Sequence, residues 1–121
     1  MRQSQISRKK GCLIAVIAID FDNTLVFVKQ PLEGAREAIN VLREAGHKII
    51  IHSCNREAWV KEVLDNNDMR YDRVHGNESK GKPLADIYVD DKGYHFPYNG
   101  SWNEQLPLVL AQIEGLDNRK W

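Results

Sequence analysis

Apolar positions gather in blocks along the chain, and the longest block covers residues 12–19. It is rich in β-branched residues, which is typical of a strand buried on both faces of a parallel sheet. Asp20, Phe21 and Asp22 follow directly. Because side chains alternate faces along an extended chain, we expect Asp20 and Asp22 to project to one side and Phe21 to pack on the other. The block predicts a central strand with two carboxylates at its carboxyl end.

The remaining pattern predicts alternating helices and strands. Apolar residues recur at helical spacing over residues 35–45, 55–68 and 103–114. Gly46 stands where a C-terminal cap belongs, and Asn55 is placed to cap the second helix. Residues 26–31 are expected to be a loop that Pro31 closes. Short apolar runs predict further strands at residues 48–53, 71–74 and 85–89.

This order of elements predicts an α/β protein with right-handed crossovers. We expect a three-layer α/β/α, Rossmann-like fold around a mainly parallel four-stranded sheet of order 3-2-1-4. The strand order reverses between the first and fourth strands, and ligands bind at such a switch point. The acids expected to meet in that crevice are Asp20, Asp22, Asp90 and Asp91.

The composition predicts one domain. With 121 residues, 17 Lys and Arg, and 17 Asp and Glu, the chain is neutral, so its net charge gives no case for a nucleic-acid partner. Residues 1–11 carry four basic residues and no acid, and we interpret them as a flexible basic tail before a single domain at 12–121. A signal peptide is a less favoured interpretation, since cleavage near Ala18 would remove the strand before Asp20.

The two cysteines and the apolar runs bear on the compartment. Cys12 and Cys54 lie at opposite ends of neighbouring predicted strands, on the order of 20 Å apart at about 3.3 Å per residue, too far for a disulfide. Reduced thiols are typical of a cytoplasmic protein. The longest apolar run is too short to span a membrane, so we expect a soluble protein.

Clustered carboxylates predict a metal ion. Acids in one crevice repel one another unless a cation lies among them, and an all-oxygen ligand set suits Mg²⁺ better than Zn²⁺. A calcium-binding EF-hand is excluded because Leu25 and Pro31 occupy the positions that need Gly and Glu. A strand ending in ordinary turn residues is the alternative interpretation of Asp20 and Asp22.

Two further residues complete a set suited to phosphoryl transfer. Ser53 follows the second strand and offers a hydroxyl and a backbone N–H to a phosphoryl oxygen, and Lys82 offers a positive charge. Lys80 is the rival lysine. Residues 76–83 nearly match a nucleotide-binding P-loop, but Pro83 replaces the hydroxyl residue that would hold Mg²⁺.

These motifs, in this order, resemble those of the haloacid dehalogenase-like hydrolase superfamily. Its first motif is similar to residues 20–25, its second to 49–53, its third to Lys82 and its fourth to 90–91; Asn23 replaces the commoner Gly. The resemblance implies that Asp20 is a nucleophile forming an aspartyl-phosphate and that Asp22 is the general acid and base. It implies that Mg²⁺ binds the Asp20 carboxylate, the Asp22 backbone carbonyl and one or both of Asp90 and Asp91.

The same resemblance implies a phosphatase for a small-molecule or nucleic-acid phosphomonoester. Only 28 residues lie between Thr24 and Ser53, and 28 between Ser53 and Lys82, so no cap domain fits. The site is then open to large substrates or closed by a neighbouring subunit of a homo-oligomer. Asn55 and Arg56 are candidate substrate contacts, because residues 53–57 resemble a segment of polynucleotide 3′-phosphatases, one residue longer here.

Three alternatives remain open at this point. Residues 94–102 are rich in aromatic side chains, which either contact substrate or pack on the core or another subunit. A phosphoacceptor switch like a response-regulator receiver uses similar residues, but in the opposite chain order. A non-catalytic phosphate-binding module is the third class, and four costly carboxylates weigh against it.

Overall fold

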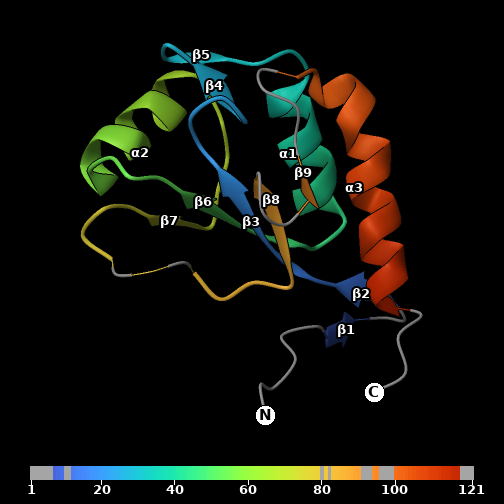
Figure 1. The fold of residues 1–121 in the computed structure, drawn as a ribbon. Helices are drawn as coiled ribbons and strands as arrows, with labels where there is room; N and C mark the ends of the chain where they lie inside the picture. Colours follow the sequence, from blue (N-terminus) through green and yellow to red (C-terminus); the bar gives the residue numbers. More distant parts are fainter. Residues whose placement is uncertain are drawn as a thin grey trace.

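A five-stranded sheet forms the centre of the molecule (Figure 1). The computed structural model describes residues 7–9, 12–79, 81, 83–90, 94–95 and 100–117. Every neighbouring pair in the sheet is parallel, in the order β7-β6-β3-β8-β9. The predicted order 3-2-1-4 is therefore confirmed, with β9 as an additional edge strand. The strands are β3 (Val16–Asp20), β6 (Lys48–His52), β7 (Arg73–His75), β8 (Ile87–Asp90) and β9 (Tyr94–His95).

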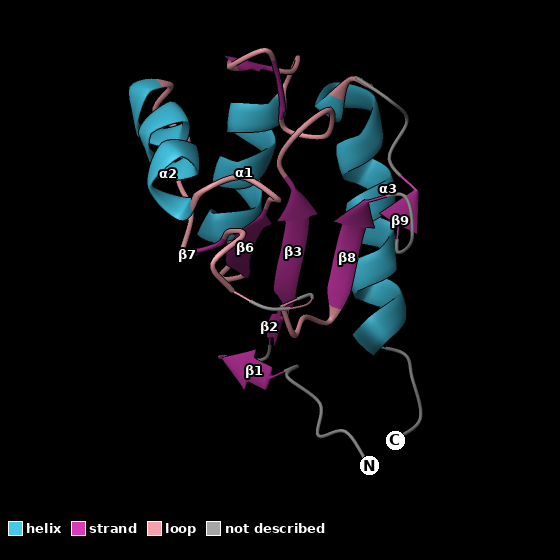
Figure 2. Ribbon diagram, turned by 60° about the vertical axis from the view of Figure 1, so that its left-hand side comes forward, coloured by secondary structure: helices cyan, strands magenta, loops and turns pink. Residues whose placement is uncertain are grey.

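The three helices found in the described part of the chain pack against the same face of this sheet. They are α1 (Ala35–Glu44), α2 (Glu57–Asn66) and α3 (Trp102–Asp117). Their buried side chains form one core cluster with Ile17 and Ile19 of β3, whereas Ala18 belongs to a second, small cluster on the opposite face. Figure 2 shows β3 and β8 in front of the helical layer. The α/β, Rossmann-like class is confirmed. Within the described residues the helices cover one face of the sheet, whereas helices had been expected on both faces.

The connections explain this layering. The chain steps from β3 to β6 and on to β7 in one direction, so right-handed crossovers place α1 and α2 on one face. The return from β7 to β8 crosses the other face, and its described residues form no helix. They lie against the sheet at Tyr88, whose hydroxyl donates to the Pro83 carbonyl at 2.7 Å and accepts from the Ala85 N–H at 3.1 Å.

The first apolar block is divided at Ala15. Its early part is β2 (Cys12–Ile14), which pairs with β1 (Ser7–Lys9) as an antiparallel hairpin outside the main sheet. Residues 7–9 had been expected in the flexible tail, and this part of the expectation is wrong because the backbone groups of β2 find partners there. Residues 1–6, 10 and 11 lie outside the described residues.

A second hairpin replaces the loop expected at residues 26–31. The strands β4 (Val26–Phe27) and β5 (Gln30–Pro31) are joined by Val28 and Lys29, which have φ values of 49° and 66°. Left-handed backbone at both turn residues matches the twist of a two-residue hairpin, although it strains a β-branched Val. Asn67 after α2 donates its side-chain N–H to the Lys29 carbonyl at 3.2 Å, which ties the hairpin to α2.

The buried His47 makes the fold sensitive to pH. Its side chain is 6% exposed, and Nδ1 accepts a hydrogen bond from the Ala15 N–H at 3.1 Å. An accepting Nδ1 requires the neutral imidazole. Burial accordingly lowers the pKa of His47 below its ordinary value.

We expect the thermal midpoint to fall as the pH drops below about 6.5, the ordinary pKa of histidine. In that range His47 is protonated in the unfolded chain but not in the folded chain, so the free energy of unfolding falls as the pH falls. This contribution to stability is fully present at pH values above about 6.5. Thermal melts of wild type and His47→Gln between pH 5 and 8 measure this. A pH dependence that is identical in the two proteins would contradict the assignment.

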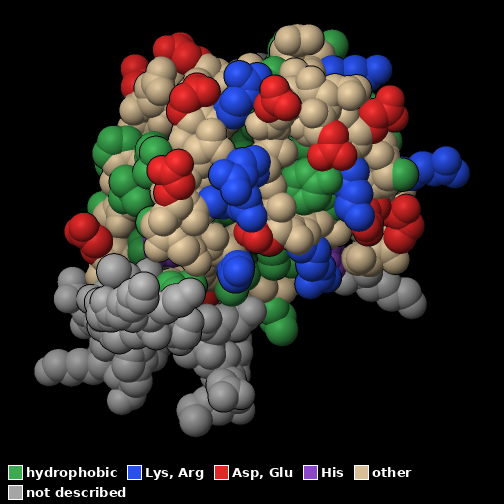
Figure 3. Space-filling model, turned by 180° about the vertical axis from the view of Figure 1, so that it is seen from behind, with side chains coloured by type: hydrophobic (Ala, Val, Ile, Leu, Met, Phe, Trp, Pro, Cys, Tyr) green, Lys and Arg blue, Asp and Glu red, His purple; other side chains and the backbone are tan. Residues whose placement is uncertain are grey.

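The surface charge and the helices of the described residues bear on nucleic-acid and membrane binding. On the face seen from behind in Figure 3, basic and acidic side chains are interspersed rather than separated. A continuous basic surface, the usual footprint of nucleic-acid binding, is not present on that face. Among the described residues, none of the helices combines the length and the apolar character needed to cross a membrane.

Candidate active site

Two of the predicted acids lie side by side at the carboxyl edge of the sheet. β3 and β8 lie side by side (Figure 2). Ile19 of β3 is in register with Val89 of β8, so Asp20 and Asp90 occupy the next positions on these parallel strands. Both are two residues beyond the registered pair Ala18 and Tyr88, and they share the face that carries no helix. Asp20 is partly buried and Asp90 is 8% exposed. Two carboxylates therefore converge at the switch point of the sheet.

Asp22 belongs to a hydrogen-bonded network with residues that follow β6. The amide Nδ2 of Asn55 donates to Asp22 Oδ2 at 2.9 Å and approaches Ser53 Oγ at 3.2 Å. The backbone N–H of Asn55 also donates to Ser53 Oγ, at 3.0 Å. Asn55 thus fixes the exposed Asp22 carboxylate beside the buried Ser53 hydroxyl.

Ser53 differs in one respect from the expectation. Its backbone N–H donates to the His75 carbonyl of β7 at 3.1 Å, so it is not available to a phosphoryl oxygen. The reason is that the residue still continues the ladder between β6 and β7. The hydroxyl accepts both bonds from Asn55 and retains its own hydrogen, which can be donated to a bound anion.

The turn after Asp22 is held from several directions. Asn23 has φ 64°, a left-handed conformation that Asn adopts more readily than most residues, which accounts for its place where a Gly is commoner. Its N–H donates to the Val26 carbonyl at 2.8 Å. From α3, Trp102 donates its indole N–H to the Thr24 carbonyl at 2.6 Å. Phe21 is fully buried, as predicted from alternation.

Trp102 resolves one alternative left open for residues 94–102. Its side chain is fully buried in the main core, so it packs and anchors the turn rather than contacting substrate. The side chains of residues 94 and 95, and all of residues 96–99, lie outside the described residues. From the sequence, Trp102 was expected in the aromatic loop and the last helix was expected to begin at residue 103, whereas α3 begins at Trp102, and nothing in the sequence pointed to Thr24.

The prediction that Asn55 caps α2 is wrong. The cap position is Arg56, whose extended backbone has φ −62° and ψ 137°, and its own side chain makes no capping bond. The Glu57 N–H is instead bound by the Glu78 carboxylate at 2.9 Å. That hydrogen bond lowers the pKa of Glu78. Because Glu78 binds this N–H, Asn55 is not needed as a cap. The sequence did not indicate this role of Glu78, because Glu78 lies in a loop far from α2 along the chain.

The loop after β7 packs tightly beneath this network. A side chain on Gly76 would meet the Glu57 nitrogen at 2.8 Å and the Asn55 carbonyl at 2.9 Å, so only Gly fits. The Asn77 N–H donates to the same Asn55 carbonyl at 2.8 Å. Further along, His75 Nε2 lies 2.8 Å from the Gly81 carbonyl. The other ring nitrogen, Nδ1, lies 3.3 Å from the Arg73 guanidinium. His75 thereby holds Gly81, the residue between the two candidate lysines, in place.

Several predicted site residues cannot be placed. Lys80, Lys82 and Asp91 lie outside the described residues. Arg56 is exposed at the start of α2. Within the described part of the chain, no group of three or more His, Cys, Asp or Glu residues could hold a metal ion. The described donor set at the sheet edge is the carboxylate pair Asp20 and Asp90, with the Asp22 network beside it.

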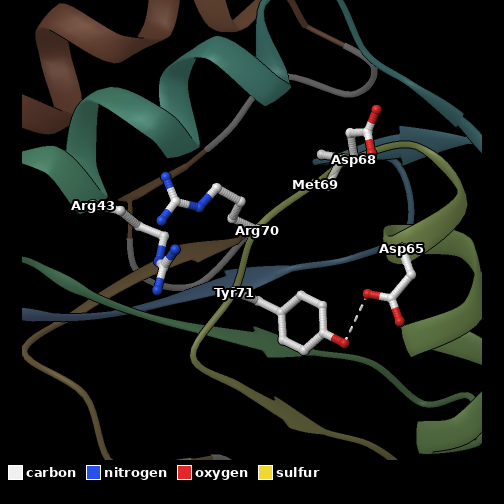
Figure 4. A pocket seen from close by; sticks show the side chains of 6 residues that line it. All are labelled: Arg43, Asp65, Asp68, Met69, Arg70 and Tyr71. Carbon is white, nitrogen blue, oxygen red and sulfur yellow. Dashed lines mark hydrogen bonds between the residues drawn. The ribbon is translucent and has the colours of Figure 1, made fainter.

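A cavity of about 620 Å³ lies at the opposite end of the sheet (Figure 4). Its walls come from the last turn of α1, the last turn of α2 and the segment between α2 and β7. Its polar groups have structural roles: Arg43 pairs with Asp72 at 3.0 Å, and the Tyr71 hydroxyl donates to Asp65 at 3.0 Å. It lies at the end of the sheet opposite Asp20 and Asp90 and is not a candidate for the catalytic centre.

Fold and site together define a small Rossmann-like α/β protein with acidic residues at the carboxyl edge of its sheet. Its fold is similar to a solved structure of a conserved protein from Bacteroides thetaiotaomicron, with a TM-score of 0.61 and 17% sequence identity. The match covers 89% of this chain and 99% of that one. At this identity the similarity shows the fold alone. Neither a protein-family model nor a curated protein matches the sequence.

Proposed function

We propose that this protein is a Mg²⁺-dependent phosphomonoester hydrolase that acts through an aspartyl-phosphate on Asp20, in the manner of haloacid dehalogenase-like hydrolases. The observation that carries the proposal is the adjacency of Asp20 and Asp90 at the carboxyl edge of β3 and β8, next to a fixed Asp22. This arrangement offers a nucleophile, a second anionic ligand and an acid within one small region.

In the proposed reaction an Asp20 carboxylate oxygen attacks phosphorus, and the bond between phosphorus and the ester oxygen breaks. Asp22, protonated at that stage, gives its proton to the leaving alcohol oxygen. A water then attacks the phosphorus of the aspartyl-phosphate and gives a proton back to Asp22. The bond between phosphorus and the Asp20 oxygen breaks, so phosphate is released and the Asp20 carboxylate is restored. One water is consumed for each phosphate and alcohol formed.

The described residues have separate parts in this scheme. Ser53 donates its remaining hydroxyl hydrogen to a phosphoryl oxygen, and Asn55 orients the Asp22 carboxylate. Lys82, outside the described residues, is proposed to supply positive charge, with Lys80 as its rival. His75 positions the segment between them through Gly81.

The donor set fits Mg²⁺. This ion keeps several waters and needs only one or two protein carboxylates, which Asp20 and Asp90 provide, and Asp91 and the Asp22 carbonyl are the other proposed ligands. When bound, the ion would neutralise the charge that develops on the phosphoryl oxygens and reduce the repulsion between the acids.

Phosphate release from p-nitrophenyl phosphate, with Mg²⁺ and with excess EDTA, tests the proposal. Turnover that requires the metal supports it. Absence of metal-dependent turnover from this ester and from a panel of phosphomonoesters would contradict it. If beryllofluoride still formed an adduct at Asp20 in that case, a phosphoacceptor switch would replace the hydrolase.

A further inference from the structure

A groove opens along the first turns of α2, beside the proposed catalytic residues. We call it the α2 groove; it has a volume of about 450 Å³ and is lined by Asn55, Arg56, Ala58, Trp59 and Glu62. This volume is within the range of small-molecule sites. No residue of the groove except Asn55 takes part in the network around Asp22.

The α2 groove starts one side chain away from Asp22. Asn55 contributes to its wall and also donates to Asp22 Oδ2 at 2.9 Å. In the proposed reaction Asp22 protonates the ester oxygen of the leaving alcohol, so that oxygen must lie next to Asp22. The remainder of the alcohol then extends away from the phosphoryl group, and the α2 groove is an adjoining cavity that can receive it.

The wall of the groove includes a fixed aromatic surface. Trp59 is partly buried and meets Phe21 edge to face, with ring centroids 5.9 Å apart and an interplanar angle of 78°. Lys29 of the β4–β5 hairpin places its ammonium over the same indole, 5.9 Å from the ring centroid, while another part of the Trp59 side chain lines the groove. An aromatic side chain held in this way offers a flat surface on which a planar ring can stack at little entropic cost.

The polar wall carries both signs of charge. Arg56 offers hydrogen-bond donors, and Glu62, one turn after Ala58, offers acceptors; both are exposed. A ring with acceptors and donors on its edges satisfies both. A leaving group with a second phosphate would be attracted by Arg56 but repelled by Glu62, which disfavours a polynucleotide chain in this groove.

We propose that the α2 groove binds the alcohol portion of the substrate and that this portion carries a planar heteroaromatic ring, as in a nucleoside monophosphate. The inference rests on the proposed function, because Asp22 defines the side from which the alcohol leaves. The ring stacks on Trp59, and its polar edge lies between Arg56 and Glu62.

Selectivity between two substrates tests this inference. The ratio of kcat/KM for adenosine 5′-monophosphate to that for glycerol 3-phosphate should fall by about tenfold or more in Trp59→Leu, as expected for the loss of one stacking contact. Arg56→Ala should lower the ratio without disturbing the core. Tyr71→Leu, which removes a partly buried aromatic ring at the opposite end of the sheet, should leave the ratio unchanged.

A binding measurement separates this inference from the proposed function. Adenosine has no phosphate, so its binding, measured by calorimetry on wild type and Trp59→Leu, does not require catalysis. Adenosine that fails to bind, or that binds both proteins equally, would contradict the groove assignment, and so would equal losses of kcat/KM for the two esters. Adenosine binding that depends on Trp59, without any metal-dependent turnover, would overturn the hydrolase proposal alone.

Discussion

Asp20→Asn is expected to abolish turnover while leaving the fold intact. The amide has nearly the same shape as the carboxylate but is a poor nucleophile, so kcat should fall by at least about 10³-fold. Asn has nearly the same shape as Asp at the end of β3, so the variant should remain folded and melt in one cooperative transition. Phosphate release and thermal melts measure the two effects.

The matched control is Asp65→Asn. It makes the same chemical change in an exposed acid at the far end of the molecule, where Asp65 accepts from the Tyr71 hydroxyl. This variant should keep wild-type turnover. An Asp20→Asn enzyme that retains metal-dependent turnover would contradict the nucleophile assignment, and loss of activity in both variants would point to a general effect of lost charge.

The sheet could be predicted because its determinants are local or follow from general rules. The apolar run before Asp20 and the Gly46 cap are local, and the right-handed crossover rule then sets the strand order. The same rule brings Asp20 and Asp90 together from opposite halves of the chain. The positions of these two acids therefore needed only strand order and the alternation of side chains.

The remaining features depend on contacts between distant segments. The sequence predicted no helix between β7 and β8, but the layering follows only when that return is combined with the strand order and the crossover rule, which place α1 and α2 on one face of the sheet. Asn55 could bind Asp22 because Glu78 caps α2 in its place, and no spacing in the sequence links those residues. The backbone N–H of Ser53 was assigned to a ligand, although a neighbouring strand already binds it.

The candidate site is also supported from outside the sheet. α3 begins at Trp102, and the Trp102 N–H donates to the Glu33 carbonyl at 2.8 Å while its indole reaches the turn after Asp22. From the segment after β6, Asn55 donates to Asp22 itself and also to the Ser53 hydroxyl. Asp22 and the turn that follows it are thus held from two separate parts of the chain, the segment after β6 and the start of α3, and weakening one of these supports should affect catalysis more than its distance from the reacting atoms indicates.

Trp102→Phe should lower both stability and turnover. Phe keeps most of the apolar contact but removes the indole N–H, which leaves the Thr24 carbonyl without that partner in a buried position. Leaving a buried acceptor unsatisfied costs about 1–3 kcal/mol of the free energy of unfolding. The turn that follows Asp22 would then be held less firmly, and kcat should fall on the order of 10-fold to 100-fold, since small displacements of catalytic groups have effects of this size.

Ile113→Ala separates the anchoring role of Trp102 from its contribution to stability. Ile113 is 5% exposed in the same helix and packs in the same core, so its truncation costs about 2–5 kcal/mol. It makes no hydrogen bond to the turn, because its side chain is a hydrocarbon, and kcat should remain near wild type at a temperature where the variant is folded. If Trp102→Phe retained full kcat, or if both variants lost it equally, the indole hydrogen bond would not be what holds Asp22 in position.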